Sequence, residues 1–565
     1  MTKTNKKAVA LLVAISIFIC LCASACKGGN SPAVHVHVVT NMIEEVPATC
    51  TQTGVKEHGN CDKCGVLVVK DGDKLIAATE ADLIIEKTPH VFKNKIVSDE
   101  YLVSEATADT PQTFAKACAC GLKSDSESDR YTVGKTLNEY AKENKEDYRP
   151  VSLTVSLYDA ANCVYGFSWN TAKTPARPVL EIKQPGETEY KKVRARYEGM
   201  SSYEFNDAGD KQISRSYIKV EAQLTPDTSY EYRIGDAYLD VYTEPVTIKA
   251  VNPTESGKWS FAHVSDSQTV GSDGAGSNSG YAFANTLKGI SKDETNRFIV
   301  HTGDVVEWSR YESYWTNMLD YNFGALSVMP VMAISGNHET TYRNGTSETY
   351  KHFNYKYPAQ TVKNGLYYSF VYGGVKFVMI NTNELNQSTG ALRDHQYKWI
   401  IEELKNNTEK WLVVGMHNPM YSVGKWGSDE SRNLIAERLT AQLGDAFAKY
   451  GVDLVLQGHD HMISKTVPIG EGGVAATETF EEINGVQYSV NPKGTIYVMN
   501  GPAGNQAKDD SAIFPHDESL YTYAEKSYIS SWADITVDGN TLTVNVRYMQ
   551  NGSIVNLKTW GVKKV

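Results

Sequence analysis

Short apolar runs that end in polar residues recur five times in the second half of the chain. They read SFAHVSD (260–266), FIVHTGD (298–304), VMAISGNHE (331–339), WLVVGMHNP (411–419) and VDLVLQGHDH (452–461). Apolar runs of this length are typical of buried strands, and in open α/β sheets ligands collect where the strands end. The pattern therefore predicts one site built from five loops.

Helical periodicity between and after these runs predicts an α/β domain over residues 256–508. Residues 394–406 and 428–450 are the clearer helices, because apolar residues recur on one face of the second at Ile435, Leu439, Leu443 and Phe447. Residues 368–380 predict a hairpin around a Gly-Gly turn. Residues 509–565 carry Asp-Gly and Asn-Gly turns and are expected to add antiparallel strands to the edge of the sheet.

Residues 150–252 show a different pattern, in which short apolar and polar stretches alternate between turn signals. Examples are VSLTVSLY (151–158), CVYGFSW (163–169) and IKVEAQL (218–224). This spacing predicts an all-β sandwich, with Trp169 and Tyr230 in its core. Residues 129–149 are rich in Ser, Asp, Glu and Lys and are expected to form a solvated linker with room for one short helix.

The first 26 residues combine a basic start, an apolar stretch from Ala8 to Ala25 and small residues before Cys26. These features predict a secretory signal, and Ala23 to Cys26 resembles a bacterial lipoprotein processing site. The expectation is an extracytoplasmic, cell-surface lipoprotein of a bacterium, lipidated at Cys26 and touching the membrane only through that anchor. The alternatives are a plain signal peptide and an uncleaved membrane anchor, because 18 apolar residues are near the minimum for a span.

Residues 27–128 contain a tether followed by small modules rich in Cys and His. Cys50, Cys61, Cys64 and His90 have spacing that fits a structural zinc site, and disulfides are the alternative. A second, decayed unit is expected to follow and to include Cys118 and Cys120. A segment with so few large apolar residues needs a structural metal or disulfides to be stable. Its expected role is that of a spacer or of a contact with the cell wall.

Length and charge limit the classes of function. A chain of 565 residues predicts several domains, and its net charge of -11 with no lysine or arginine block gives no electrostatic basis for nucleic-acid binding. The α/β region contains no cysteine, so disulfides do not hold it together.

The five loops supply carboxylate, amide and imidazole groups, a mixture that suits iron, manganese or zinc. The candidate metal ligands are Asp266, Asp304, Asn337, His417, His459 and His461. Two ions about 3.5–4 Å apart need a bridging ligand, and Asp304 is the candidate. The order and spacing of these residues resemble those of the calcineurin-like metallophosphoesterase superfamily, and especially of its purple acid phosphatase branch. Residues 150–252 similarly resemble the fibronectin-III-like domain that precedes the catalytic domain in that branch.

The resemblance implies an α/β metallophosphoesterase sandwich, made of mixed sheets flanked by helices, with two bound Fe, Mn or Zn ions. One ion would be held by Asp266, Asp304 and His461, and the other by Asp304, Asn337, His417 and His459. The implied reaction is hydrolysis of a small phosphomonoester by a metal-bound hydroxide. His338 would orient the phosphate or protonate the leaving group.

Two positions depart from the family pattern. Gln268 stands where many relatives have histidine, and Glu307 stands where purple acid phosphatases have tyrosine. Either residue is a candidate for an additional metal ligand or for a hydrogen bond to one. The alternatives are a phosphodiesterase or nucleotidase with the same site, and a surface adhesin whose metal site has decayed. His263 and His301 lie inside apolar runs and are expected to be core histidines.

Overall fold

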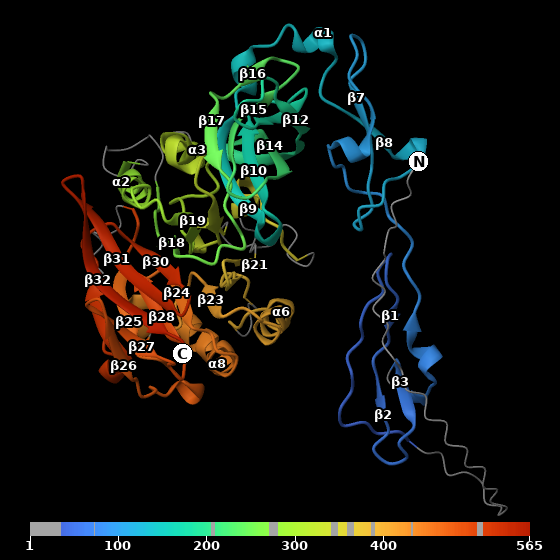
Figure 1. Ribbon diagram of the computed structural model, residues 1–565. Coiled ribbons are helices and arrows are strands. Elements are labelled where there is room, and N and C mark those ends of the chain that lie inside the picture. Colours follow the sequence, from blue (N-terminus) through green and yellow to red (C-terminus); the bar gives the residue numbers. More distant parts are fainter. Residues whose placement is uncertain are drawn as a thin grey trace, which may run out of the picture. The chain divides into compact units, whose positions relative to one another are not determined.

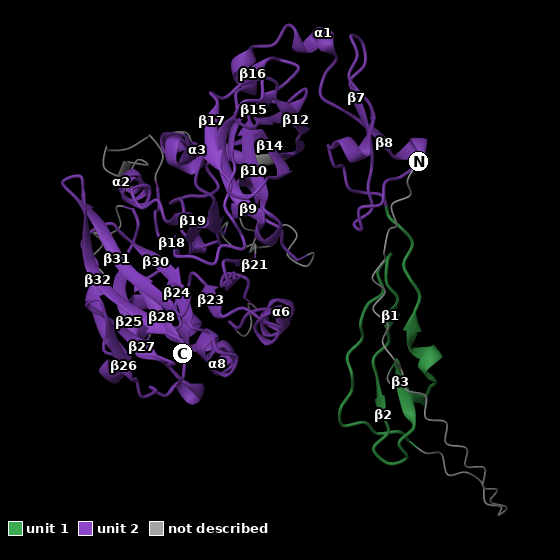
Figure 2. Cartoon of the chain, in the orientation of Figure 1, with its two compact units in different colours: residues 1–91 green, residues 92–565 purple. Residues whose placement is uncertain are grey.

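The protein is described here by a computed structural model, shown in Figure 1. The described residues are 36–72, 74–204, 210–269, 281–340, 348–358, 367–385, 390–430, 433–504 and 512–565. The predicted signal and lipidation site, residues 1–26, lies outside them. The chain forms two compact units, residues 1–91 and 92–565 (Figure 2). Within the described ranges, no helix has both the length and the apolar character needed to cross a membrane.

The first unit contains short strands and one 3-10 turn. Strands β2 (His58–Asn60), β3 (Leu67–Asp71) and β4 (Lys74–Ala77) form an antiparallel sheet, and β1 (Gly54–Val55) pairs with β5 (Ile84–Ile85). The 3-10 turn is η1 (Glu80–Leu83). This unit ends at residue 91, within the region up to residue 128 that was predicted to hold small Cys-rich modules.

The second unit begins with a small sheet of β6 (Leu102–Ser104), β7 (Gln112–Ala115) and β8 (Arg130–Val133). Residues 129–149 were predicted to be a solvated linker with room for one short helix. They hold β8, the short helix α1 (Leu137–Tyr140) and a 3-10 turn at Lys145–Tyr148. Tyr140 and Tyr148 pack in one cluster with Ala176 and Leu239. The segment is ordered because these two aromatic side chains are buried. Its polar composition gave no indication of this burial.

Two sheets follow and share a hydrophobic core. The first, in the order β13-β14-β10-β9, consists of β13 (Arg196–Glu204), β14 (Lys211–Gln223), β10 (Val164–Thr171) and β9 (Val151–Asp159). The second contains β12 (Lys191–Arg194), β11 (Pro178–Lys183), β15 (Ser229–Asp236), β16 (Val241–Tyr242) and β17 (Val246–Lys249). Phe167 and Tyr232 meet edge to face between the sheets, and Trp169 and Tyr230 are buried, as predicted. The fibronectin-III-like assignment stays a prediction.

The α/β region is built on two further sheets. The eight-stranded sheet has the order β20-β19-β18-β30-β31-β32-β27-β26. Its strands are β18 (Trp259–Val264), β19 (Asn296–His301), β20 (Val331–Ala333), β26 (Phe480–Ile483), β27 (Val486–Val490), β30 (Ser531–Asp538), β31 (Thr541–Gln550) and β32 (Ser553–Lys563). Strands β18 to β20 are parallel, and β30 joins β18 in antiparallel pairing. The C-terminal strands therefore continue the sheet from β18.

The seven-stranded sheet has the order β21-β22-β23-β24-β28-β25-β29. Its strands are β21 (Tyr368–Tyr372), β22 (Val375–Met379), β23 (Trp411–Gly415), β24 (Leu454–Gln457), β25 (Met462–Thr466), β28 (Ile496–Asn500) and β29 (Tyr521–Lys526). Strands β21 and β22 form the predicted hairpin, with Gly373 and Gly374 at positive φ in its turn. Phe377 packs on Phe261 and Phe298 of the other sheet, so the two sheets face each other.

Helices cover the outer faces of these sheets (Figure 1). Helices α6 (Asp394–Lys405) and α8 (Leu434–Lys449) bury Ile400 and Leu443 against Val414 of the seven-stranded sheet. Helix α2 (Tyr281–Ile290) contacts β30 and β31. The predicted helix over 428–450 is shorter, because α8 begins at Leu434 and the separate turn α7 (Lys425–Ser428) precedes it. The remaining helices are α3 (Glu312–Tyr321), α4 (Phe323–Leu326) and α5 (Thr349–His352).

Candidate metal centre

The six predicted ligands follow five strands whose carboxyl ends face one region. Asp266 follows β18, Asp304 follows β19, Asn337 follows β20, and His417 follows β23. His459 and His461 lie between β24 and β25. Asp266, Asp304 and His459 have positive φ angles of 53°, 54° and 74°. Non-glycine residues adopt this conformation at a cost and concentrate at functional sites.

The ligand atoms divide into two neighbouring groups. One ligand atom each from Asp304, His417 and His459 lies within 4.8 Å of the other two. Asn337 Oδ1 is 3.0 Å from His417 Nε2, which is also 3.2 Å from Asp304 Oδ2. His461 Nε2 is 3.6 Å from Asp266 Oδ1. The division of these ligands between two ions stays a prediction.

The donor set fits metal cations. Asp266 and Asp304 are each 2 % exposed, and among the described residues their ion-pair partners are histidines rather than lysines or arginines. Two buried carboxylates are costly unless cations or hydrogen bonds compensate them. Oxygen and imidazole donors together suit iron, manganese or zinc.

Hydrogen bonds hold the ligands in place. His417 Nδ1 lies 2.9 Å from the carbonyl oxygen of Thr302, which favours a proton on Nδ1 and turns Nε2 toward the other ligands. The backbone N–H of His459 donates to both oxygens of Asp266, each at 3.1 Å. A Cβ at Gly336 would overlap Asp304 Oδ1, so this position requires glycine.

The pKa shifts reflect the same crowding. Burial opposes ionisation of Asp304, but His417 and His338 lower its pKa below the ordinary value. Burial alone would lower the pKa of His417. The negative charge of the adjacent Asp304 has the larger effect and raises this pKa to about 9. Burial, and then His417, lower the pKa of His459 to about 3. His459 is therefore a neutral imidazole over the ordinary pH range, whereas His417 would have to give up a proton when a metal binds, because metal ligands are neutral imidazoles.

Glu339 is a positioning residue that sequence reasoning missed. Its carboxylate is fully buried and accepts hydrogen bonds from the backbone N–H groups of Asp304, Val305, Val306 and Gly336, at 2.8 to 3.2 Å. It thus joins the loop after β19 to the loop after β20. The available signal was its position three residues after Gly336, the N-cap of η6 (Asn337–Glu339), from which a glutamate can reach back to free N–H groups.

The ligand groups open into a cavity of about 290 Å³. It is lined by Gln268, Asp304, Asn337, His338, Lys425, Trp426, His459, Asp460, His461, Ala512 and Phe514. Lys425 and Trp426 were not predicted. Asp460 places them, because it accepts hydrogen bonds from the N–H of Trp426 and from Ser422 Oγ. The cavity therefore has a cationic and aromatic edge contributed by α7.

His338 is anchored beside the ligands by the two residues that depart from the family pattern. Its Nδ1 lies 2.7 Å from the carbonyl oxygen of Glu307, and its Nε2 lies 3.1 Å from Gln268 Nε2. Gln268 Oε1 and Glu307 Oε2 are buried without a hydrogen-bond partner. Both oxygens are available for a metal ion or for its bound water, and burial raises the pKa of Glu307.

Two histidines are not part of the centre. His263 is buried and hydrogen-bonds to Thr302 and Asn500, and His301 is buried and hydrogen-bonds to Ser267. Both are core histidines, as predicted. Asn505 and the glycine-rich stretch 271–280 lie outside the described residues.

The predicted zinc set is not brought together as one group. Cys61 and Cys64 cluster with His37, and neither Cys50 nor His90 belongs to that group. Sequence spacing had favoured Cys50 and His90 because they match a common zinc pattern, but the fold places an earlier histidine next to the Cys-x-x-Cys turn.

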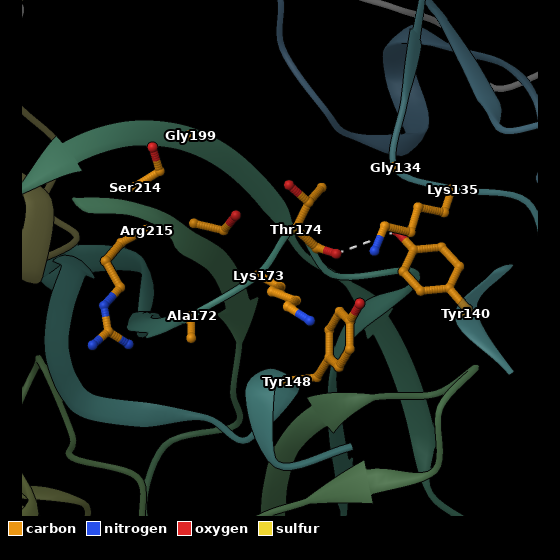
Figure 3. A pocket seen from close by; sticks show the side chains of 11 residues that line it. Gly134, Lys135, Tyr140, Tyr148, Ala172, Lys173, Thr174, Gly199, Ser214 and Arg215 are labelled. Atoms are coloured by element: carbon orange, nitrogen blue, oxygen red, sulfur yellow. Dashed lines mark hydrogen bonds between the residues drawn. The ribbon is translucent and has the colours of Figure 1, made fainter. Parts of the chain in front are cut away.

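A second cavity, of about 320 Å³, lies within residues 134–216 and is lined by Tyr140, Tyr148, Lys173 and Arg215 among others (Figure 3). Lys135 and Lys173 both pair with Glu143, at 2.5 Å, and Lys173 also pairs with Asp147. Because its lysines are already neutralised, this cavity is a poorer candidate for binding an anion than the cavity at the ligand groups.

Comparisons with known proteins point to the same site. Residues 260–462 match the family model for calcineurin-like phosphoesterases. Purple acid phosphatase 23 of Arabidopsis thaliana is 26% identical over 314 residues, which cover 51% of this chain and 62% of that protein. Human acid phosphatase type 7 is 26% identical over 35% of this chain and 46% of its own length. The chain thus spans less than two thirds of these relatives.

Other relatives bear on the fold and on activity. A purple acid phosphatase from yellow lupin (Lupinus luteus) seeds superposes with a TM-score of 0.59 at 19% identity, covering 74% of this chain and 75% of that one, which shows a shared fold. The probable inactive purple acid phosphatase 27 of Arabidopsis thaliana is 26% identical over 59% of this chain and 55% of its own length. Similarity alone therefore does not separate active from inactive members.

Proposed function

Because the chain belongs, through residues 260–462, to the calcineurin-like phosphoesterases and is similar to purple acid phosphatases, we propose that it hydrolyses phosphate monoesters at a two-metal centre. The observation that carries the proposal is that the six ligands lie together, all of them buried or half-buried except the exposed Asn337, with Asp304 paired to histidines. Small phosphate esters fit the cavity of about 290 Å³.

The residues would hold two ions of iron, manganese or zinc. One ion would be held by Asp266 and His461. The other would be held by Asn337, His417 and His459, and Asp304 would contact both ions. When bound, such ions supply Lewis acidity, ionise a water molecule near neutral pH and neutralise the charge on phosphate oxygens. The chain has a net charge of -11, so a local positive field is needed to attract an anionic ester.

The chain's own groups would bind and orient the ester. His338 lines the cavity, with its Nδ1 against the carbonyl oxygen of Glu307 and its Nε2 against the amide nitrogen of Gln268. To donate a hydrogen bond to a phosphate oxygen or a proton to the leaving alkoxide, Nε2 would have to carry a proton and exchange its contact with Gln268 for one with the ester. Lys425 would pair with a second phosphate oxygen, and Trp426 would pack on the organic part of the ester.

Substitution of the bridging ligand tests this proposal. Asp304→Ala should abolish metal binding at the centre and turnover of nitrophenyl phosphate, while His338→Ala should keep the metals and lose rate by about 10²–10⁴-fold. Asp394→Ala, in the first turn of α6, is the control. Metal content by elemental analysis and initial rates are measured together. Near-normal activity of Asp304→Ala would show that the bridging assignment is wrong.

Two other functions give different results in the same experiments. A phosphodiesterase or nucleotidase would prefer bis-nitrophenyl phosphate or nucleotides over the monoester. An adhesin with a decayed site would bind well below two ions and stay inactive after Mn, Fe or Zn is supplied. That second reading is favoured only by Gln268 and Glu307, which instead contact His338 in the structure.

The cellular location of the protein is part of the proposal. A secretory signal with lipidation at Cys26 would put the enzyme on the bacterial surface, with the first unit as a spacer or a contact with the cell wall. The anchor would be its only membrane contact, and nucleic acid is not an expected partner. Metabolic labelling with a fatty acid, compared between the natural chain and Cys26→Ala, tests the anchor.

A further inference from the structure

We propose that His37, Cys61 and Cys64 hold a zinc ion that stabilises the first unit, residues 1–91. One ligand atom from each of these residues lies within 4.8 Å of the other two. Cys64 Sγ is 3.8 Å from His37 Nδ1. A tetrahedral zinc ion with a sulfur at about 2.3 Å and a nitrogen at about 2.0 Å keeps these two atoms about 3.6 Å apart. The observed separation therefore matches two ligands of one ion.

The backbone around the two cysteines forms a tight turn of the kind that a metal requires. Gly65 N–H donates to the carbonyl oxygen of Cys61 at 2.8 Å, and Cys61 N–H donates to that of Val66 at 2.9 Å. Gly65 has a φ of 71°, which glycine adopts without strain. The turn leads into β3, which begins at Leu67, so both cysteines lie at one end of the β2–β3 hairpin.

Two hydrogen bonds bring the histidine to this turn. Asp62 N–H, between the cysteines, donates to the carbonyl oxygen of Val38 at 2.9 Å. Thr40 Oγ1 donates to Asp62 Oδ2 at 2.7 Å. His37 precedes Val38, so the bond to Val38 holds the imidazole beside the sulfurs. The arrangement is thus built by the fold of the unit and does not depend on the side-chain contact alone.

The unit also needs a stabilising element beyond its apolar core. Among its described residues, the buried apolar side chains are Cys61, Val68, Val69 and Leu83. Others that would normally be buried are open to solvent, including Val36 at 71%, Ile43 at 57% and Val46 at 56%. A module with so small a core is usually held by disulfides or a structural metal. Zinc at the Cys61–Cys64 turn would tie the N-terminal stretch to the sheet.

The test uses the full chain and measures zinc and thiolate coordination. Cys61→Ser/Cys64→Ser and His37→Ala should each bind about one zinc ion fewer than the natural chain, because a soft ligand is lost. His58→Ala is the matched control, since His58 lies in the same unit and its ring hydrogen-bonds to the carbonyl oxygen of Lys56, while its backbone bonds to Ile43 do not depend on the side chain. Elemental analysis after dialysis against zinc gives the count.

A second readout separates this site from the catalytic centre. Residues 256–565 contain no cysteine, so the thiolate-to-metal absorption of a cobalt-loaded chain arises only from the N-terminal part. That absorption should fall in both variants and persist in His58→Ala, while turnover of nitrophenyl phosphate stays unchanged in all three. Unchanged zinc and cobalt signals in the variants, or thiol titration that finds Cys61 and Cys64 joined as a disulfide, would overturn the proposal whether or not the chain is a phosphatase.

Discussion

At the scale of single residues, the site differs from its sequence prediction mainly in what surrounds the ligands. The ligands were predictable because each follows an apolar run directly, and a strand end fixes where such a residue must lie. Lys425, Trp426 and Glu339 were not, because they reach the site through backbone hydrogen bonds made by Asp460 and by Glu339 itself. Contacts of that kind leave no periodic trace in a sequence.

Lys425 gives a prediction at this scale. It lines the cavity, and a phosphate there would gain a charge-assisted hydrogen bond. Lys425→Ala should raise KM for nitrophenyl phosphate about tenfold, as expected for the loss of one such bond at a partly exposed position, and should leave the metal content unchanged. Lys425→Arg should recover part of the affinity.

Steady-state kinetics at fixed ionic strength checks this expectation. Lys449→Ala, at the C-terminal end of α8, removes the same charge from another helix end and serves as the control. Equal effects of the two alanine variants would mean that Lys425 contributes only through the net charge of the protein.

At the scale of elements, the loops after β19 and β20 act as one piece because Glu339 joins them. Glu339→Gln keeps the size of the side chain but replaces one acceptor oxygen with an NH₂ group, which must then face backbone N–H donors. Leaving one or two buried donors unsatisfied costs about 1–3 kcal/mol each. The variant should unfold at lower denaturant concentration and bind its metals more weakly, because Asp304 and Asn337 lose their fixed separation.

Denaturant unfolding and competition with a chelator measure the two effects. Glu437→Gln, on the exposed face of α8, is a matched substitution that should change neither. If Glu339→Gln loses stability but keeps full metal affinity, the residue supports the fold without positioning the ligands.

The same scale shows why some element boundaries were missed. The hairpin at 368–380 was predictable from its Gly-Gly turn, because few residues adopt positive φ there. Residues 129–149 were not, because Tyr140 and Tyr148 are isolated in a polar sequence and acquire their burial from Ala176 and Leu239, which lie far along the chain. Helix α8 was placed six residues early because the α7 turn continues the same apparent helical pattern.

At the scale of the whole molecule, the β-sandwich and the α/β region meet at a buried carboxylate. Glu312, at the start of α3, is 1 % exposed and accepts hydrogen bonds from Tyr217 and Asn170 of the sandwich, at 2.6 and 2.7 Å. Ser152 Oγ is 3.4 Å from Glu312 Oε1, and His352 Nε2 of α5 is 3.6 Å from Glu312 Oε2. Arg215 and Lys351 are the nearby cations. Burial raises the pKa of Glu312 to about 7.

This shift predicts how stability depends on pH. The pKa of Glu312 is higher in the folded chain than in the unfolded chain, so folding takes up a proton between pH 4.5 and about 7. The stabilisation is complete below pH 4.5 and is lost as the pH rises through about 7, with an upper limit of about 3 kcal/mol at 1.36 kcal/mol per pKa unit. Glu312→Gln should remove this dependence, because the amide stays neutral.

Urea unfolding followed by tryptophan fluorescence at pH 5 and pH 8 measures the difference. The natural chain should lose more stability than Glu312→Gln between the two values, and Glu437→Gln should behave like the natural chain. Equal slopes for all three would mean that Glu312 stays ionised in the folded protein, held by its hydrogen bonds.

The pairing of β18 with β30 affects how the protein is made. A ribosome that has reached residue 500 has already synthesised every metal ligand, yet β18 still lacks the neighbour that will lie against it from residue 531 onward. Until that strand emerges, the strand that carries Asp266 has an open edge, and open edges invite pairing with other chains. We therefore expect the nascent protein to need protection from aggregation until β30 has emerged, and the candidate metal loops to reach their final shape only after that.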